Sequence, residues 1–307
     1  MVKRSYRLKT PISVTIGRVL SLLLGVLLLL RLFTALDFTA PDEDHFYVYV
    51  LDVGQSDAIL LRCGAKTMLI DAATATEERA LRAALSCYGV KHLDYLVLTH
   101  PHEDHMGNAR WVIENIEVET VLLPTAASDD YMYGLICDTA ARCAVTKTAE
   151  AGQSFALGGA EVQILIASGD TDSASETQDN VNNSSTVLRV QFGTQVFLFM
   201  GDVEADAELS LLSAYDAQYL DCDFLKVGHH GSNTSTTALF LTTVTPTVAA
   251  ISCGRQNTYG FPHEAVLKNL TLFGVHTYRT DRSGTLVFGT DGQEIRVIPS
   301  DTKGLSL

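Results

Sequence analysis

The stretch Thr99-His100-Pro101-His102-Glu103-Asp104-His105-Met106-Gly107 decides the fold of this chain of 307 residues. It directly follows the apolar run Tyr95-Leu96-Val97-Leu98, which predicts a strand. Three imidazoles and two carboxylates lie within six residues at this strand end, and burying them for packing alone would be too costly because each needs a partner or a metal. A solvated polar turn is the alternative, but the density of ligand-type side chains disfavours it. The stretch therefore predicts a metal site.

The spacing H-x-H-x-D-H suits two cations. His100 and His102 are two residues apart, so an extended backbone puts both rings on one side, and Asp104 and His105 follow as the chain turns. One pair can hold one ion and the next pair a second, as two-metal hydrolysis requires. Asp202 follows an apolar strand and a glycine, and we predict that its carboxylate bridges the two ions.

Two adjacent histidines follow the apolar segment Phe224–Val227. We predict that His229 completes the second ion's site with Asp104 and His105. Its neighbour His230 points elsewhere on any extended backbone, so we expect it beside the ligands or the substrate and not on the metal.

Three further polar residues are candidates for the same site. His263 stands where a helix opens, and a ligand role and a role in substrate contact or proton transfer are both open for it. Asp57 ends a turn and Asp71 ends a strand. Functional sites usually form from polar groups at such a sheet edge, so we predict that both residues support the metal ligands. Ordinary turn chemistry is the alternative for both carboxylates.

The apolar pattern predicts an α/β protein with four layers in the order αββα. Two strand-rich halves alternate with helices, which suits two packed sheets with helices on both outer faces, and no domain boundary is evident within residues 41–307. Thr74 and Glu77 have capping-box spacing ahead of one helix, and residues 107–116 read as another. Strands are expected at residues 46–51, 58–62, 67–70, 95–98, 120–123, 162–166, 186–190, 196–200, 224–227, 248–252 and 285–288.

Residues 1–40 are set apart by composition and are expected to form one transmembrane segment. Residues 19–30 carry no charge and eight leucines, and the wider segment 12–36 is long enough to span a bilayer if Arg18 and Arg31 reach toward its surfaces. An uncleaved signal anchor and a cleaved signal peptide compete here. No A-x-A-like site with two small residues follows the segment, so we favour the anchor, with residues 41–307 extracytoplasmic; secretion after cleavage is the alternative.

The net negative charge of the chain disfavours binding of a long polyanion. Formal charge is −14 overall, and the first 40 residues hold six of the 22 Lys and Arg and one of the 36 Asp and Glu, so residues 41–307 carry about −19. Nucleic-acid binding therefore needs local basic groups or metal ions. The candidates are Lys226, Arg255, Lys268, Arg279 and Arg282.

Six cysteines show no C-x-x-C spacing, which excludes a zinc-ribbon signal. Their even number permits disulfides outside the membrane, where Cys137 with Cys143 would close the shortest loop. Free thiols are the alternative.

The H-x-H-x-D-H stretch resembles the signature of the metallo-β-lactamase superfamily. More narrowly, several motifs occur in the order expected of the metallo-β-lactamase domain of ComEC-type competence proteins, and the resemblance covers nearly everything from residue 46 to residue 297. It implies an αββα hydrolase with two divalent ions, Zn²⁺ or Mn²⁺, that acts as a phosphodiesterase or nuclease on DNA outside the membrane. The motifs are Leu51-Asp52-Val53-Gly54-Gln55-Ser56-Asp57-Ala58, His100 to His105, Asn182-Asn183-Ser184-Ser185, Gly201-Asp202, Lys226-Val227-Gly228-His229-His230-Gly231-Ser232 and Asn257 to His263.

Two departures from the family pattern matter. Many superfamily members supply a histidine between the first motif and the bridging aspartate, but residues 106–201 contain none, and Asn183 falls about where it would come. A first site with only His100, His102 and Asp202 would be open and oxygen-rich, which favours Mn²⁺ beside Zn²⁺. ComEC-type proteins also carry a polytopic channel, whereas this chain has one hydrophobic segment, so DNA uptake would need a channel partner.

The expected reaction is attack on phosphorus by a hydroxide that bridges the two ions, oriented by Asp104 or Asp202. His229 or His263 would protonate the leaving oxygen. Hydrolysis of a small phosphodiester, lactone or thioester is one alternative, and a non-catalytic nucleic-acid-binding module of an uptake complex is another. Lys226 and Arg255 would clamp phosphate, and the other expected substrate contacts are Asn183, Ser184, His230, Ser232 and Asn257.

Overall fold

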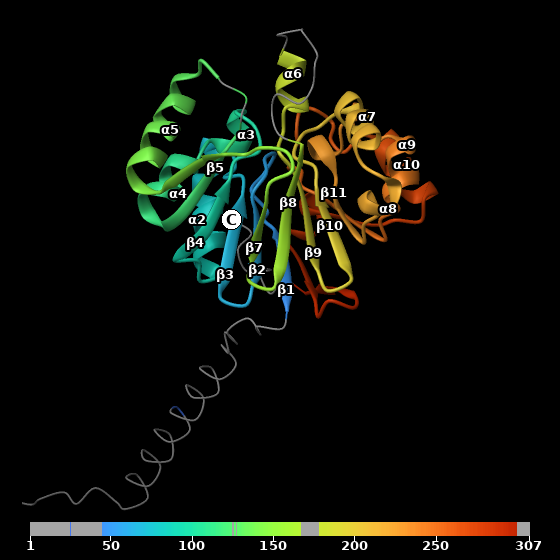
Figure 1. The fold of residues 1–307 in the computed structure, drawn as a ribbon, viewed down its shortest axis with the longest axis horizontal. Helices are drawn as coiled ribbons and strands as arrows, with labels where there is room; N and C mark the ends of the chain where they lie inside the picture. Colours follow the sequence, from blue (N-terminus) through green and yellow to red (C-terminus); the bar gives the residue numbers. More distant parts are fainter. Residues whose placement is uncertain (1–24, 26–44, 125, 127, 167–177, 300–307) are drawn as a thin grey trace, which may run out of the picture. The chain divides into compact units, whose positions relative to one another are not determined.

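Two β-sheets pack face to face at the centre of the computed structural model, with helices on both outer sides (Figure 1). The structure describes residues 45–299, apart from 125, 127 and 167–177, together with residue 25. All the elements below belong to one compact unit within residues 41–307. The predicted αββα sandwich is confirmed.

The first sheet has the strand order β15-β14-β1-β2-β3-β4-β5-β6. The pairs β3/β4, β4/β5 and β5/β6 are parallel, and the other neighbours are antiparallel. Its strands are β1 (Phe46–Val50), β2 (Ile59–Cys63), β3 (Lys66–Ile70), β4 (His92–Val97), β5 (Glu117–Leu123), β6 (Val145–Thr148), β14 (Leu286–Thr290) and β15 (Ile295–Ile298).

The second sheet has the strand order β13-β12-β11-β10-β9-β8-β7. The expected hairpin is present as the antiparallel pair β9/β10, while β10, β11, β12 and β13 run parallel to one another. Its strands are β7 (Ser154–Leu157), β8 (Ala160–Ile166), β9 (Val187–Phe192), β10 (Gln195–Phe199), β11 (Phe224–Lys226), β12 (Val248–Ile251) and β13 (His276–Arg279).

Three apolar clusters hold the four layers together. The middle one lies between the sheets, where Phe46 of β1 packs edge-on against Phe197 of β10 at a ring-centroid distance of 5.0 Å. One outer cluster packs α2 (Glu78–Cys87), α4 (Ala109–Asn115) and α5 (Tyr131–Cys143) on the first sheet. The other packs α7 (Ala205–Ala214), α9 (Ala238–Val244) and α10 (Glu264–Leu272) on the second sheet. The remaining short helices are α3 (Glu103–Met106), α6 (Gln178–Asn183), α8 (Ala217–Leu220), α11 (Thr280–Ser283), η1 (Ala75–Glu77) and η2 (Gly228–Gly231).

The predicted capping box at Thr74 is wrong. The Thr74 side chain makes no cap hydrogen bond, and α2 begins only at Glu78. Thr74 Oγ1 and the Ala75 N–H instead donate to Glu103 Oε1, each at 2.7 Å, because the metal stretch folds back over this turn. Gly107 is required there, since a Cβ would lie 2.3 Å from the Ala75 nitrogen. One end of the metal stretch is thus tied to the turn that precedes α2.

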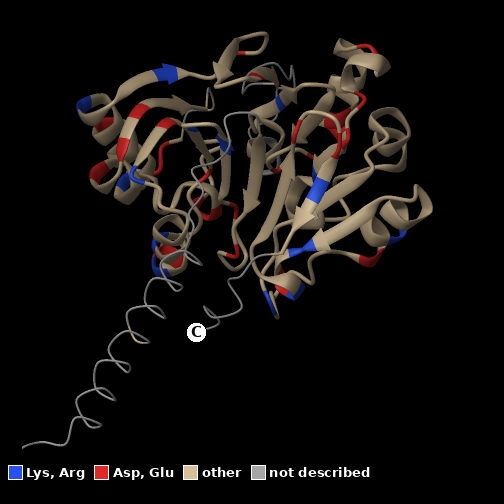
Figure 2. Cartoon of the chain, turned by 90° about the horizontal axis from the view of Figure 1, so that it is seen from below, with Lys and Arg blue, Asp and Glu red and all other residues tan. Residues whose placement is uncertain are grey.

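The predicted transmembrane segment, apart from residue 25, lies outside the described residues. Among residues 45–299 with their gaps, no helix is long and apolar enough to cross a membrane. All six cysteines are free thiols in the structure, including Cys137 and Cys143. Lys and Arg are dispersed over the described elements and do not gather on one of them (Figure 2).

Candidate metal centre

The candidate centre lies where strands of both sheets end. The metal stretch follows β4, and His102 is the N-cap residue of α3, which places Asp104 and His105 in the first turn of that helix. Asp202 follows β10, and His230 lies in η2 directly after β11. The first sheet therefore contributes two of these side chains and the second sheet the other two.

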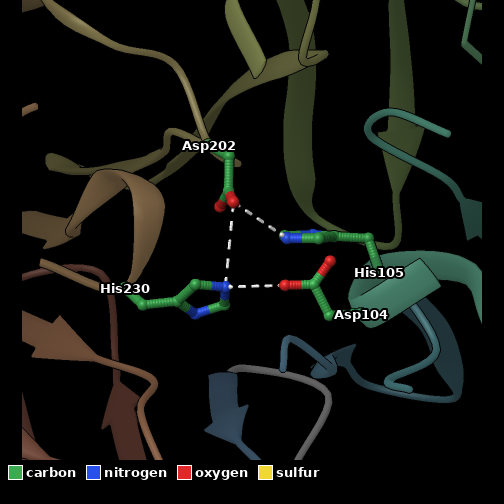
Figure 3. Close-up of side chains that lie close together, drawn as sticks. All are labelled: Asp104, His105, Asp202 and His230. Carbon is green, nitrogen blue, oxygen red and sulfur yellow. Dashed lines mark ion pairs between the residues drawn. The ribbon is translucent and has the colours of Figure 1, made fainter. Parts of the chain in front are cut away.

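Asp104, His105, Asp202 and His230 point toward one another (Figure 3). Each offers one ligand atom, and these atoms all lie within 4.8 Å of one another. His105 Nε2 is 3.2 Å from Asp202 Oδ2, and His230 Nε2 is 3.4 Å from Asp104 Oδ2 and 3.7 Å from Asp202 Oδ2. The only opening among the four side chains is at Asp104, which is 36 % exposed.

Three buried atoms of this cluster have no hydrogen-bond partner: His105 Nε2, Asp202 Oδ1 and His230 Nε2. Burying such atoms without partners is costly, so they call for a further group at the centre. Two imidazoles and two carboxylates are a donor set that Zn²⁺, Mn²⁺ and Fe²⁺ all accept. The residues present therefore fit a divalent cation.

The electrostatics of the cluster also favour positive charge at its centre. Burial lowers the pKa of His105, but Asp202, Asp71 and Asp104 outweigh it and hold that pKa well above its usual range. Burial raises the pKa of Asp202, and the positive charges of His105 and His230 reverse this and hold it well below its usual range. A cation at the centre would also supply positive charge that stabilises these carboxylates.

Asp71 orients His105 from behind. His105 Nδ1 lies 2.7 Å from Asp71 Oδ2, which leaves Nε2 facing the centre. The Thr99 N–H and hydroxyl both donate to the same carboxylate at 2.8 Å. A carboxylate behind a histidine ring is the arrangement that fixes ring orientation in metal sites. Asp71 thus lies where we expected a supporting residue.

The two adjacent histidines lie opposite to expectation. We placed His229 on the second ion with Asp104 and His105, and His230 outside it, but His230 is the one that faces Asp104. Both residues adopt a left-handed backbone, with φ of 45° and 52°, so the alternation of an extended chain does not apply.

His229 stays at the rim of the cluster. Its Nε2 is 3.9 Å from Asp202 Oδ2, and its side chain is 21 % exposed. Its Nδ1 lies 3.0 Å from Glu204 Oε1, which also accepts a hydrogen bond from Thr234 Oγ1 at 2.8 Å. Glu204 was not singled out in the sequence, and it holds the His229 ring with Nε2 toward the centre.

Lys226 does not face a substrate, which corrects its expected role as a phosphate clamp. Its side chain is fully buried, and Nζ donates to Asp57 Oδ2 at 2.7 Å and to the Val227 carbonyl at 3.1 Å. Asp57 Oδ1 lies 3.5 Å from His230 Nδ1, which is also 3.0 Å from the Ser252 carbonyl. The buried pair therefore backs His230, as Asp71 backs His105.

His100 and His102 lie beside this cluster and in contact with each other. His100 Nε2 is 3.0 Å from His102 Nδ1, and the rings of His100 and His105 are 4.1 Å apart. Burial and the charge of His105 hold the pKa of His100 well below its usual range, and burial lowers the pKa of His102. A lowered pKa favours the neutral imidazole, which is the form that binds metal.

Ser185 is a site residue that we did not single out. Its Oγ lies 3.2 Å from His100 Nδ1 and accepts a hydrogen bond from the Asp202 N–H at 3.1 Å. It thereby joins one half of the centre to the other. Its position at the end of the polar motif Asn182–Ser185 was the available signal, but serine is too common in turns to be chosen on that ground alone.

Other predicted substrate contacts hold loops in place. Asn183 Oδ1 accepts from the Glu204 N–H at 2.9 Å, and Ser184 Oγ donates to the Val181 carbonyl at 2.6 Å. Ser232 is buried, and its Oγ lies 2.9 Å from Thr234 Oγ1. These contacts use the side-chain groups expected to meet the substrate.

The last predicted residues lie on the segment that follows β12. Asn257 uses its whole side-chain amide within this loop, donating to the Gly254 and Phe261 carbonyls and accepting from the Phe261 N–H. Arg255 is exposed, and its Nε donates to the Asp281 carbonyl at 3.0 Å. His263 Nδ1 accepts from the Asn233 N–H at 2.9 Å.

The fold and the cluster together define a class of protein. The family described as the metallo-beta-lactamase superfamily matches residues 51–255, about two thirds of the chain. The chain belongs to this superfamily and has its metal-dependent hydrolase fold, which implies divalent metal ions. Among solved structures, the metallo-beta-lactamase fold protein YhfI from Bacillus subtilis has a TM-score of 0.55 at 13 % identity, covering 80 % of this chain and 100 % of that one. That likeness concerns the fold alone.

The sequence relatives of this chain include competence proteins, of which it matches one part. The chain is 32 % identical over 212 residues to ComE operon protein 3 of Bacillus subtilis (strain 168), covering 69 % of this chain and 26 % of that protein. It is 33 % identical over 265 residues to Competence protein ComA of Neisseria gonorrhoeae, covering 85 % and 35 %. The resemblance to ComEC-type proteins is confirmed, and the chain spans about a quarter to a third of the length of these relatives.

Proposed function

We propose that this chain is a metal-dependent phosphodiesterase or nuclease that acts on DNA. One observation carries the proposal: two imidazoles and two carboxylates from both sheets converge with three buried atoms left without hydrogen-bond partners. The similarity to two proteins named for competence supports DNA as the substrate.

In this proposal His100 and His102 would hold one divalent ion, with Asp202 as a further ligand. Asp104, His105 and Asp202 would hold a second ion together with His230, in the position expected for His229. Donation from His100 Nδ1–H to Ser185 Oγ would leave the Nε2 lone pair for the first ion. Bound there, Zn²⁺ or Mn²⁺ would polarise a phosphoryl oxygen and lower the pKa of a coordinated water.

The protein's own groups then position the substrate and move a proton. Glu204 holds the His229 ring at the rim with Nε2 toward the cluster, where that atom can donate a proton to the leaving oxygen. The His263 ring meets Phe261 edge-on at 5.1 Å, as the His229 ring does at 5.4 Å. His263 Nδ1 accepts a hydrogen bond from the Asn233 N–H, which leaves Nε2 for a substrate oxygen. Of the two residues predicted to clamp phosphate, Arg255 is exposed, whereas Lys226 is buried.

The location of the reaction also belongs to the proposal. Residues 1–40 would anchor the chain in a membrane with the hydrolase outside, or be removed on secretion, and a separate channel would carry DNA. The formal charge near −19 of residues 41–307 favours one other candidate, a small phosphodiester, because a long polyanion would be repelled.

The decisive experiment measures bound metal and hydrolysis in the full chain. Single-stranded DNA, duplex DNA, RNA and a generic phosphodiester are each assayed with Mn²⁺ and with Zn²⁺. Asp104→Ala and Asp202→Ala should lose activity by at least a hundredfold, whereas Asp206→Ala, an exposed carboxylate in the first turn of α7, should keep it. Unchanged activity in both site variants would refute the two-metal mechanism. Cleavage of the generic phosphodiester alone would favour the small substrate.

A further inference from the structure

A ladder of aromatic rings leads from the solvent to the candidate metal centre. Tyr259 stacks on Phe261 with a centroid distance of 5.4 Å and an interplanar angle of 14°. Phe261 in turn stacks on His230, at 6.3 Å and 25°, and meets the His229 ring edge-on at 5.4 Å. The innermost ring of the ladder therefore belongs to the metal cluster itself.

The loop that carries these rings is held rigidly against the cluster. The Asn257 amide closes the loop through three hydrogen bonds to the backbone of Gly254 and Phe261. Gly231 packs so tightly on the loop that a Cβ would lie 2.5 Å from Pro262 Cβ. The next residue, His263, donates its N–H to the Gly231 carbonyl at 2.9 Å. The rings are therefore presented in a fixed position, which lowers the entropic cost of binding.

Tyr259 has the exposure of a binding group. Its side chain is 66 % exposed although one face of the ring is covered by Phe261, so the outer face is open to solvent. A flat ring needs no charge to bind a nucleobase, because every base has a face that stacks. This matters in a unit whose formal charge is near −19, where phosphate contacts alone would give little affinity.

We propose that Tyr259 is a stacking platform for an unpaired nucleobase next to the reacting phosphate, so that the substrate is single-stranded nucleic acid. This inference rests on the proposed phosphodiesterase function and adds the residue that selects the substrate. Bases in a duplex are already stacked and paired, and they cannot reach the ring without being flipped out. Binding through the ring should depend only weakly on salt, because stacking releases no counterions.

The test compares Tyr259→Ala, Tyr259→Phe and Phe273→Ala in the full chain. Phe273 is an exposed phenylalanine at the far end of α10 from His263 and serves as the matched control. Binding of a labelled single-stranded oligonucleotide is measured by fluorescence anisotropy in EDTA, which stops metal-dependent cleavage. Tyr259→Ala should weaken binding about tenfold, equivalent to about 1.4 kcal/mol, while the other two variants stay within about twofold of the wild type.

Two further ligands make the result specific. The same oligonucleotide with abasic sites should bind the wild type and Tyr259→Ala equally weakly, and duplex DNA should not distinguish them. Equal losses on all three ligands, or no loss on any, would overturn the inference. With Mn²⁺ present, a KM effect confined to base-containing single strands supports the inference. If the protein binds bases through Tyr259 but cleaves no substrate, the result counts against the proposed function alone. If it cleaves single strands and Tyr259→Ala leaves the cleavage unchanged, the result counts against this inference alone.

Discussion

Replacing Lys226 by methionine tests whether this lysine is structural or binds phosphate. The change keeps most of the apolar volume but leaves the Asp57 carboxylate without its ammonium partner in a place where both side chains are at most 1 % exposed. Burial raises the pKa of Asp57, and Lys226, followed by His230 and His105, outweighs it and lowers that pKa. Lys226→Met therefore removes the largest favourable charge from a buried carboxylate.

The expected loss of stability follows from the burial of this pair. Breaking a buried ion pair from one side typically costs about 3–5 kcal/mol, because the remaining charge has neither partner nor water. For a unit of this size, such a loss lowers Tm by roughly 10 °C. Lys268→Met provides the matched control, because Lys268 pairs with Glu264 at 2.9 Å with its side chain 72 % exposed, and exposed pairs contribute less than about 1 kcal/mol.

Urea unfolding followed by circular dichroism, with EDTA throughout, measures both variants without a contribution from metal. A double variant, Lys226→Met with Asp57→Asn, should recover part of the loss because it removes the unpaired charge as well. Equal costs for Lys226→Met and Lys268→Met would refute the reasoning. So would a Lys226→Met protein of wild-type stability whose only defect is a raised KM, since that result would restore the phosphate role.

Three further predictions are tested by substitution, two of them at the centre and the third at Glu208 in α7. His230→Ala should lose more bound Mn²⁺ or Zn²⁺ than His229→Ala by elemental analysis, and the reverse order would restore our first assignment. Ser185→Ala should destabilise the protein by about 1 kcal/mol and weaken metal binding about tenfold, measured by competition with a chelator; unchanged affinity would contradict the link to His100 and Asp202. Burial raises the pKa of Glu208 above its ordinary 4.5, so the folded protein holds this proton more tightly than the unfolded chain. The free energy of unfolding of the wild type, relative to that of Glu208→Gln, should therefore fall as the pH rises from 4.5 through the folded pKa. A difference in urea unfolding that does not change with pH would contradict this direction.

Local sequence patterns predicted most of the sandwich because the strands carry their own signal. The hairpin of residues 186–200 and the strands at residues 46–51 and 67–70 are apolar runs bounded by turn residues, and the structure has β9, β10, β1 and β3 there. The edge strand β6 was not predicted, since all four of its residues are exposed and it has no apolar run to detect. α5, which lay in a segment we left unassigned, shows an apolar face only once its packing is known.

The candidate centre was predictable in its donors but not in its geometry. Asp104, His105 and Asp202 were chosen from their residue types and their positions after strands, and the structure brings them together. The choice between His229 and His230 depended on backbone angles that the sequence does not reveal, since neither residue is a glycine and both adopt positive φ. Period-two reasoning fails wherever a strand ends in such a turn.

Contacts between buried residues that are distant in the sequence were also not predictable, and Asp57 is an example. This residue lies between β1 and β2 of the first sheet, and its carboxylate binds Lys226, the last residue of β11 in the second sheet, 169 positions away. Its backbone N–H donates to the Asp104 carbonyl at 3.1 Å, and its Oδ1 lies 3.5 Å from His230 Nδ1. One residue thus contacts a donor of the cluster from each sheet and the lysine that joins the sheets. A protein in which well-packed apolar groups replace a buried ion pair is often no less stable. Stability is therefore not the reason to keep the charge of Asp57. We infer that its role is to position Asp104 of one sheet against His230 of the other.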